Sequence, residues 1–262
     1  MWNTMDGQGP EAWYASLPKV TKTIITSMFI LTLFTTFKII SLQSIVLDWQ
    51  IIRKTYGVHR ILLACLYAGQ FSFRWVIQAY MFSQFSTTLE RNPVFSSSVG
   101  SYLYFILIEV VLICLISLIF YWPSGFPFLN DALMFSILYY WSKRDMWNSV
   151  SIYVFTVKAY QLPYAMLFLN FIMGAPMIIN IIGMIAGHIY YLIREVLPTM
   201  GYKNYVSKTP HWIDYIAGRL DAMYEYAGLN MGQRPFSGPY NLYRQRPIRI
   251  PFTGRGVRLG TL

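Results

Sequence analysis

One apolar segment limits what this chain can fold into. Residues 99–121 form an apolar run whose single charged residue is Glu109. A straight helix needs about 20 apolar residues to cross the ~30 Å hydrocarbon core of a bilayer, so this run is long enough. Only 12% of the 262 residues are charged and 55% are hydrophobic, whereas a soluble domain carries about 25% charged residues. The sequence therefore predicts an integral membrane protein.

Five further apolar stretches bring the expected number of spans to six. They lie at about residues 20–40, 61–85, 126–141, 150–171 and 177–193. The fourth and sixth spans are shorter than a bilayer core requires, which favours a locally thinned membrane or polar helix ends within it. We predict an all-α polytopic membrane protein whose six-helix domain covers residues 20–197.

Charge sets the expected orientation, because basic loops face the cytosol. From residue 198 onward, nine Lys or Arg residues oppose three acids. Six spans put both ends on one side, so both termini are predicted to be cytosolic, with residues 1–19 as an interfacial segment. The loop between the first two spans disagrees, since Arg53, Lys54 and Arg60 would then face the lumen.

Two segments are expected after the membrane domain. Residues 198–228 predict an amphipathic cytosolic helix on or near the membrane, because apolar residues recur at helical spacing. These residues are Trp212, Ile216, Leu220, Met223 and Ala227. Residues 229–262 hold six arginines and no acid, a composition that cannot bury a core and predicts disorder.

Polar residues at membrane depth are the first candidates for function. They are Arg74, Gln78, Glu109, Asp131 and Lys158. Ionisable groups inside a membrane are costly, and they face the bundle interior or a water-filled cavity. Two interpretations stay open: interior ion pairs with snorkelling side chains, or a wet cavity that opens to one leaflet. Ion pairs with snorkelling are the simpler interpretation, and the short spans add support for the cavity.

The sixth predicted span carries a second candidate. Gly183 and Gly187, four residues apart, leave a bare groove where another helix can approach closely. Burying the polar ring of His188 beside them is costly unless it has a hydrogen-bond partner or a catalytic role. A hydrogen bond between helices is the simpler explanation. The rival is an active intramembrane serine protease with Ser136 as nucleophile. Ser136 has bulky neighbours and lies in no Gly-x-Ser-Gly motif, so we predict no catalytic residues.

Other classes of function lack a motif in this sequence. There is no metal-ligand cluster, no Walker loop and no GxGxxG pattern, so no cofactor or metal is expected. Topology and anionic headgroups account for the basic charge, and no nucleic-acid partner is expected. A small-solute channel or transporter is a second rival, although the internal repeat and interrupted helices typical of transporters are not visible.

Several segments taken together resemble the derlin (Der1-like) family of rhomboid-related pseudoproteases. They are residues 11–22, 72–93, 141–145, 158–163 and 183–191. The resemblance covers about residues 10–212. It implies a rhomboid-like fold and a first luminal loop that inserts into the membrane through Trp49. Derlins usually have Trp-Arg in that loop, whereas this chain has Trp49-Gln50.

The tail contains a further resemblance, to the SHP box of derlins and other adaptors. It rests on Phe252, Gly254, Gly256 and Leu259. An aromatic residue and a leucine seven residues apart can fill two pockets, while the glycines let the backbone lie flat between them. This resemblance implies binding to the AAA+ ATPase valosin-containing protein.

The family resemblance implies a multi-pass protein of the endoplasmic reticulum membrane. It would aid the retrotranslocation of misfolded luminal and membrane proteins to the cytosol for ubiquitin-dependent protein catabolism. The implied partners are a membrane-embedded ubiquitin ligase complex, the AAA+ ATPase, misfolded substrates, the lipid bilayer and further copies of the chain.

Overall fold

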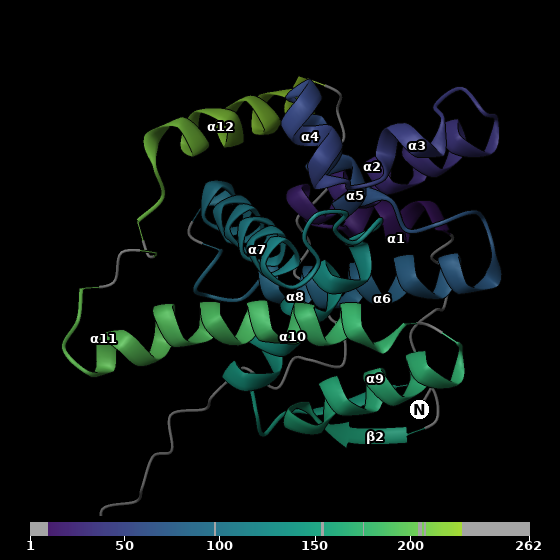
Figure 1. Ribbon diagram of the computed structural model, residues 1–262. Coiled ribbons are helices and arrows are strands. Elements are labelled where there is room, and N and C mark those ends of the chain that lie inside the picture. Colours follow the sequence, from purple (N-terminus) through teal and green to yellow (C-terminus); the bar gives the residue numbers. More distant parts are fainter. Residues whose placement is uncertain are drawn as a thin grey trace, which may run out of the picture.

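The computed structural model describes residues 10–96, 98–152, 155–174, 176–203, 206 and 208–226. Helices dominate it (Figure 1). The first half contains α1 (Pro10–Ser16), α2 (Lys19–Thr36), α3 (Leu42–Ile45), α4 (Trp49–Thr55), α5 (His59–Leu66), α6 (Phe73–Glu90) and α7 (Val99–Phe120). The second half contains α8 (Asn130–Arg144), α9 (Leu162–Ile172), α10 (Met177–Tyr191), the π-helix η2 (Leu192–Val196), α11 (Leu197–Thr199) and α12 (His211–Tyr226).

Helix α8 is the centre of the bundle (Figure 1). Twelve of its 15 residues are buried, as expected of a helix that is covered on all sides. Helices α6, α7, α9 and α10 pack against it, and α2 packs on the outer side of α6. Helix α8 therefore fixes the positions of the residues that these helices turn toward it.

Two helices in the described residues are long and apolar enough to cross a bilayer. One is α7, and the other runs from Met177 to Thr199 through α10, η2 and α11. The second reaches beyond the predicted span at 177–193, because η2 continues α10 without a break. The count of six spans and the cytosolic termini stay predictions.

The predicted second span, residues 61–85, is not one helix. Helix α5 ends at Leu66, and α6 begins at Phe73. Between them, Gly69 has a φ of 99°, a conformation that glycine adopts at little cost. The Ser72 hydroxyl accepts a hydrogen bond from the Trp75 amide at 3.2 Å and so caps the new helix.

The predicted fifth span, residues 150–171, also needs correction, although the fold is mostly helical, as predicted. Strands β1 (Ser149–Ile152) and β2 (Phe155–Lys158) form an antiparallel hairpin, followed by the 3-10 turn η1 (Ala159–Gln161). β-branched and aromatic residues prefer the extended conformation, whereas Pro163 suits the first turn of α9. Helix α9 has 11 residues and is therefore about 16 Å long.

A buried carboxylate joins α2 to α6. Glu90 accepts hydrogen bonds from the amides of Val20 at 3.0 Å and Thr21 at 2.8 Å, and from the Thr21 hydroxyl at 2.7 Å. Hydroxyl contacts continue from Thr21 to Ser86 and from Ser86 to Tyr102, each at 2.7 Å. This network fixes the first turn of α2 against α6 and α7.

The segment predicted at 198–228 contains α12. It buries Ile213, Ala217 and Tyr224, while Trp212 and Ile216 of the predicted apolar stripe are exposed. Ala227 and the tail at 229–262 lie outside the described residues, and with them the SHP-like positions Phe252, Gly254, Gly256 and Leu259.

Candidate functional site

Helices α8 and α10 meet along a seam where two glycines of α10 contact the backbone of α8. A Cβ atom placed on Gly183 would overlap the carbonyl group of Ala132, and one on Gly187 would lie 3.1 Å from the Ser136 Cα. Only glycine allows backbones to approach this closely. The structure thus places Gly183 and Gly187 one turn apart on the face of α10 that contacts α8.

His188 lies at the same seam and contacts a tyrosine of α8. Its Nδ1 is 3.0 Å from the Tyr139 hydroxyl. Ser136 is fully buried, and its hydroxyl donates to the Leu133 carbonyl at 2.8 Å. Among the described residues, Ser136 and His188 share no hydrogen bond with each other. The geometry of each residue is that of helix packing, with no base oriented on the serine.

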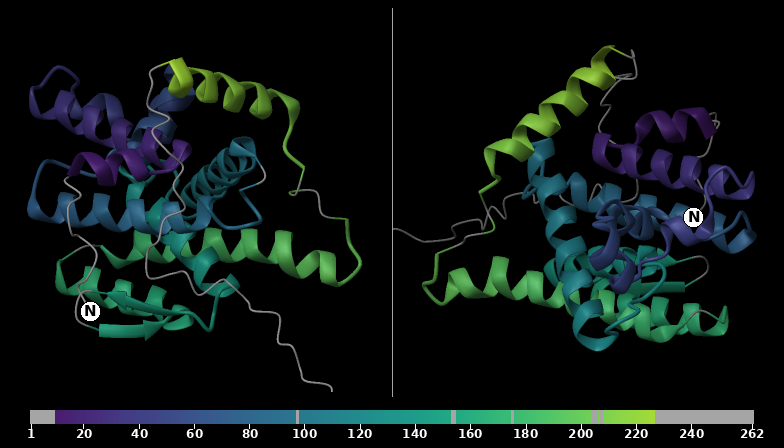
Figure 2. Two further views of the ribbon diagram at one scale, coloured as in Figure 1. Left: turned by 180° about the vertical axis from the view of Figure 1, so that it is seen from behind. Right: turned by 45° about the horizontal axis from the view of Figure 1, so that its top comes forward.

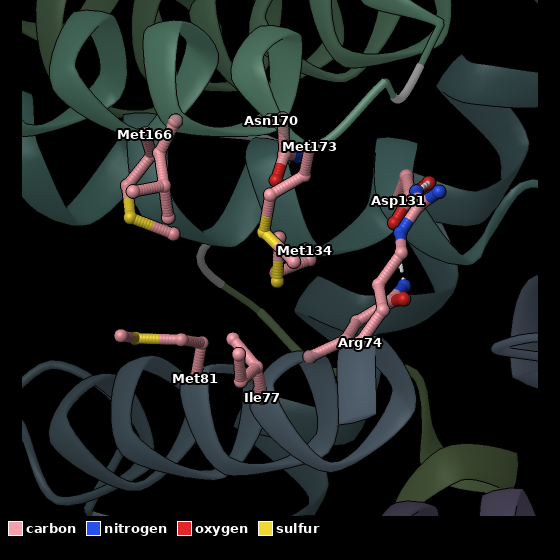
Figure 3. Close-up of a pocket in the computed structure, with 10 residues that line it drawn as sticks. Arg74, Ile77, Met81, Asp131, Met134, Met166, Asn170 and Met173 are labelled. Atoms are coloured by element: carbon pink, nitrogen blue, oxygen red, sulfur yellow. Dashed lines mark hydrogen bonds and ion pairs between the residues drawn. The ribbon is translucent and has the colours of Figure 1, made fainter. Parts of the chain in front are cut away.

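A narrow cleft opens on the other side of α8 (Figure 3). Its floor is α8, and its two walls are α6 and α9. Ten residues line it: Arg74, Ile77, Gln78 and Met81 from α6, Asp131 and Met134 from α8, Met166, Leu169 and Asn170 from α9, and Met173 just after it. We call it the methionine cleft. Its volume is ≈ 20 Å³, room for about one water molecule.

A polar network closes one end of the methionine cleft (Figure 3). Arg74 Nη2 lies 3.2 Å from Asp131 Oδ2. Gln78 Nε2 donates to Asp131 Oδ1 at 2.5 Å and to Asn130 Oδ1 at 2.9 Å. Asn130 Nδ2 in turn donates to the Cys65 carbonyl at 2.8 Å. An ion pair and amides that satisfy one another are the arrangement that makes charge tolerable at membrane depth.

Three of the five predicted polar residues, Arg74, Gln78 and Asp131, therefore meet in one place. Glu109 does not join them. It is fully buried in α7 beside Ser136 of α8, outside the cleft network. Lys158 is not in a span, because it ends strand β2 with its Nζ 5.4 Å from the centroid of the Trp147 ring.

Methionine is the part of this site that sequence reasoning missed. Met81, Met134, Met166 and Met173 face the gap from three segments (Figure 3). A signal was present in the spacing. Met81 follows Gln78 and Met134 follows Asp131 by three residues, which puts each methionine on the same helix face as the polar residue.

The side chain of Trp49 packs inside the protein, and insertion of its loop into the membrane stays a prediction. Its side chain is 9% exposed and belongs to the hydrophobic core. A Cβ atom on Gly125 would lie 2.8 Å from Trp49 Cδ1, so the glycine makes room for the indole. Gln50 is exposed. The exposed apolar residues of this loop are others, such as Tyr56 and Val58.

Comparison with known proteins identifies the family. The sequence model of the Der1-like family matches residues 17–211. Derlin-1 of Arabidopsis thaliana is 32% identical over 80% of this chain and 78% of its own length. Derlin-2.2 of the same plant is 29% identical over 79% of this chain and 87% of its own length, and Derlin-1.1 of Zea mays is 26% identical over 80% and 86%. The resemblance noted in the sequence is confirmed, and the chain belongs to the Der1-like family.

Proposed function

We propose that this protein is a derlin-type component of endoplasmic-reticulum-associated degradation. It would be a six-span, rhomboid-like protein of the endoplasmic reticulum membrane with cytosolic termini, and it would help misfolded luminal and membrane proteins to reach the cytosol. Membership of the Der1-like family supports the general role. The methionine cleft is the structural observation that carries the mechanism.

The lining of the cleft suits substrates of varied sequence. Methionine is unbranched and flexible, so it repacks around different apolar shapes, as promiscuous binding surfaces do. The ion pair of Arg74 and Asp131 offers donors and acceptors at one end for the polar residues of a misfolded segment. The apolar side chains of a substrate would therefore leave the lipid and contact the methionine thioethers, while its polar groups would form hydrogen bonds with Arg74 and Asp131.

The cleft is too narrow for a helix as it stands, so binding requires a wall to move. The α8–α10 seam is in direct backbone contact and cannot yield without separating two helices. Helices α6 and α9 face each other across the gap, and each rests on α8. Movement of α6 or α9 away from the other would admit a substrate segment from the bilayer.

We infer no proteolysis by this protein. The energy for pulling the substrate out of the membrane would therefore come from partner proteins. The Ser136 hydroxyl is buried and engaged within its own helix, which supports a pseudoprotease. The tail residues Phe252 and Leu259 would recruit the AAA+ ATPase valosin-containing protein. A membrane-embedded ubiquitin ligase would modify the emerging substrate, and further copies of the chain would complete the assembly.

Site-specific crosslinking tests the cleft. The photoreactive amino acid benzoylphenylalanine is placed at Met173, which lines the cleft and is 36% exposed, or at Leu115, which is exposed on α7. In microsomes that hold a misfolded membrane substrate, we expect a crosslinked product from position 173 that exceeds the product from position 115. Equal yields from the two positions would show that the substrate contacts the protein surface at random.

A separate experiment tests the tail. The double substitution Phe252→Ala and Leu259→Ala removes both side chains that would fill the two pockets, and Thr253→Ala is the matched control. We expect loss of ATPase co-purification from the double variant alone. Retention of the ATPase by the double variant would make the tail assignment wrong and leave the cleft untouched.

A further inference from the structure

Helix α12 is fixed to the N-terminal turns of α2 and α7 and lies on the outside of the bundle (Figure 2). Lys19 Nζ forms an ion pair with Asp221 Oδ1 at 2.7 Å. The hydroxyls of Thr23 and Tyr224 are 2.9 Å apart. A Cβ atom on Gly100, in the first turn of α7, would lie 3.6 Å from the Cβ of Ala217. These contacts set both the position and the rotation of α12.

Successive residues of an α-helix are about 100° apart, and this divides α12 into three sectors. The buried sector, Ile213, Ala217 and Tyr224, packs against the bundle. The acidic sector carries the carboxylates Asp214, Asp221 and Glu225. The apolar sector consists of Trp212, Ile216 and Met223, which are 56%, 47% and 55% exposed. The apolar sector lies opposite the acidic sector.

The contacts to α2 give the direction in which each sector points. Lys19 is the first residue of α2, and Thr23 lies one turn further along it. Asp221 of the acidic sector bonds to Lys19, whereas Tyr224 of the buried sector bonds to Thr23. The acidic sector is therefore next to the N-terminal end of α2, and the buried sector is one turn closer to the middle of α2. The apolar sector is on the opposite side of α12 from the acidic sector, so it points along α2 toward the middle of the bundle.

We propose that α12 is an interfacial helix whose apolar sector inserts into the cytosolic leaflet beside α2 and α7. Trp212 would lie at the headgroup level, where tryptophan is favoured. Arg219, whose guanidinium carbon is 5.9 Å from the centroid of the Tyr215 ring, would extend to lipid phosphates. In the acidic sector, Asp221 would keep its ion pair with Lys19, and the exposed Glu225 would face water, away from the anionic surface.

The basic charge that follows α12 in the sequence supports a lipid surface, rather than another protein, as the partner of the apolar sector. Residues 229–262 begin three residues after the end of α12 and contain six arginines and no acid, and anionic lipids attract such a segment. Anchoring α12 would therefore hold the start of the tail at the membrane surface. The inference rests on the membrane placement proposed above and does not depend on the role in degradation.

Spin labelling in bilayers tests the insertion. The full chain, with the buried Cys65 and Cys114 replaced by Ala, is reconstituted in vesicles of phosphatidylcholine and phosphatidylserine. A nitroxide is attached at Ile216→Cys or Met223→Cys in the apolar sector, or at Glu225→Cys, the exposed control on the acidic sector. Collisions with oxygen report lipid, and collisions with a water-soluble nickel chelate report the aqueous phase.

We expect the two apolar positions to lose accessibility to the nickel chelate and gain accessibility to oxygen relative to position 225. Equal nickel accessibility at all three positions would place the apolar sector in water and overturn the proposal. Shielding of positions 216 and 223 from both reagents would also overturn it, because a protein or a second copy of the chain would then cover the sector. A degradation assay is not needed for any of these outcomes.

Discussion

Glu90→Gln tests most directly how α2 is held in place. Helix α2 begins at Lys19, and its N-cap residue, Pro18, provides no side-chain hydrogen bond to the free amides of the first turn. Glu90 of α6 supplies that function from another helix, because its carboxylate accepts from the amides of Val20 and Thr21. Glutamine has nearly the same shape but only one acceptor oxygen and no charge.

Two effects set the size of the expected loss. Removal of an N-terminal cap costs about 1 kcal/mol, and loss of a negative charge at a helix N-terminus costs about 0.3–1 kcal/mol, more when the site is partly buried. Glu90 is 8% exposed, so solvent screens the interaction little, although a neutral amide is cheaper to bury. We expect a free energy of unfolding lower by about 2 kcal/mol, which corresponds to a Tm lower by about 4–8 °C for a chain of this size.

The protein carries its own reporters for the assay. Cys65 and Cys114 are free and buried, so a maleimide dye that fluoresces on reaction with a thiol will follow unfolding in detergent. Glu225→Gln, the same change at an exposed carboxylate, is the matched control and should leave Tm unchanged. The reasoning fails if Glu90→Gln unfolds at the temperature of that control.

Three further outcomes are expected. Gly187→Leu should abolish the folded protein because a Cβ there meets the backbone of α8, whereas Gly218→Leu, with no atom within 4 Å of the added Cβ, should fold normally; size-exclusion chromatography separates the two. Asp131→Asn should lower the free energy of unfolding by about 1–3 kcal/mol by removing a charge-assisted partner, and combining it with Arg74→Met should cost less than the sum of the single changes. Ser136→Ala should change neither substrate degradation nor labelling by a fluorophosphonate probe, since the hydroxyl is buried and bonded within α8.

Local sequence signals were sufficient where the structure depends on one helix at a time. The apolar run at 99–121 corresponds to α7, and the spacing of Gly183 and Gly187 indicated the face of α10 that meets α8. Hydropathy failed where apolar character continues through a change of conformation. Residues 150–171 are mostly apolar, yet a hairpin and a short helix divide them, because hydropathy alone does not distinguish a strand from a helix.

The features that sequence reasoning missed came from contacts between distant segments. Tryptophan is a residue type that often anchors loops in a membrane. The side chain of Trp49 instead packs beside Gly125, which is far along the chain. The methionine cleft likewise exists only because α6 and α9 pack on the same helix. No periodicity within one segment contains that information, although the matching spacing of Gln78–Met81 and Asp131–Met134 was a usable hint.

Helix α8 contacts both the glycine seam with α10 and the methionine cleft, and together these two features indicate which helices would move in the proposed mechanism. One of its faces is in backbone contact with α10, and the other presents Asp131 and Met134 to the cleft. Because there is no room for an added side chain at Gly183 or Gly187, we expect α8 and α10 to move together and the proposed opening to occur at α6 or α9. Helix α9 is the shorter, about 16 Å, and a helix of that length cannot cover a ~30 Å hydrocarbon core. In the six-span arrangement that we propose, the bilayer beside α9 would therefore thin or expose polar backbone, and a misfolded segment would meet its lowest barrier to leaving the lipid there.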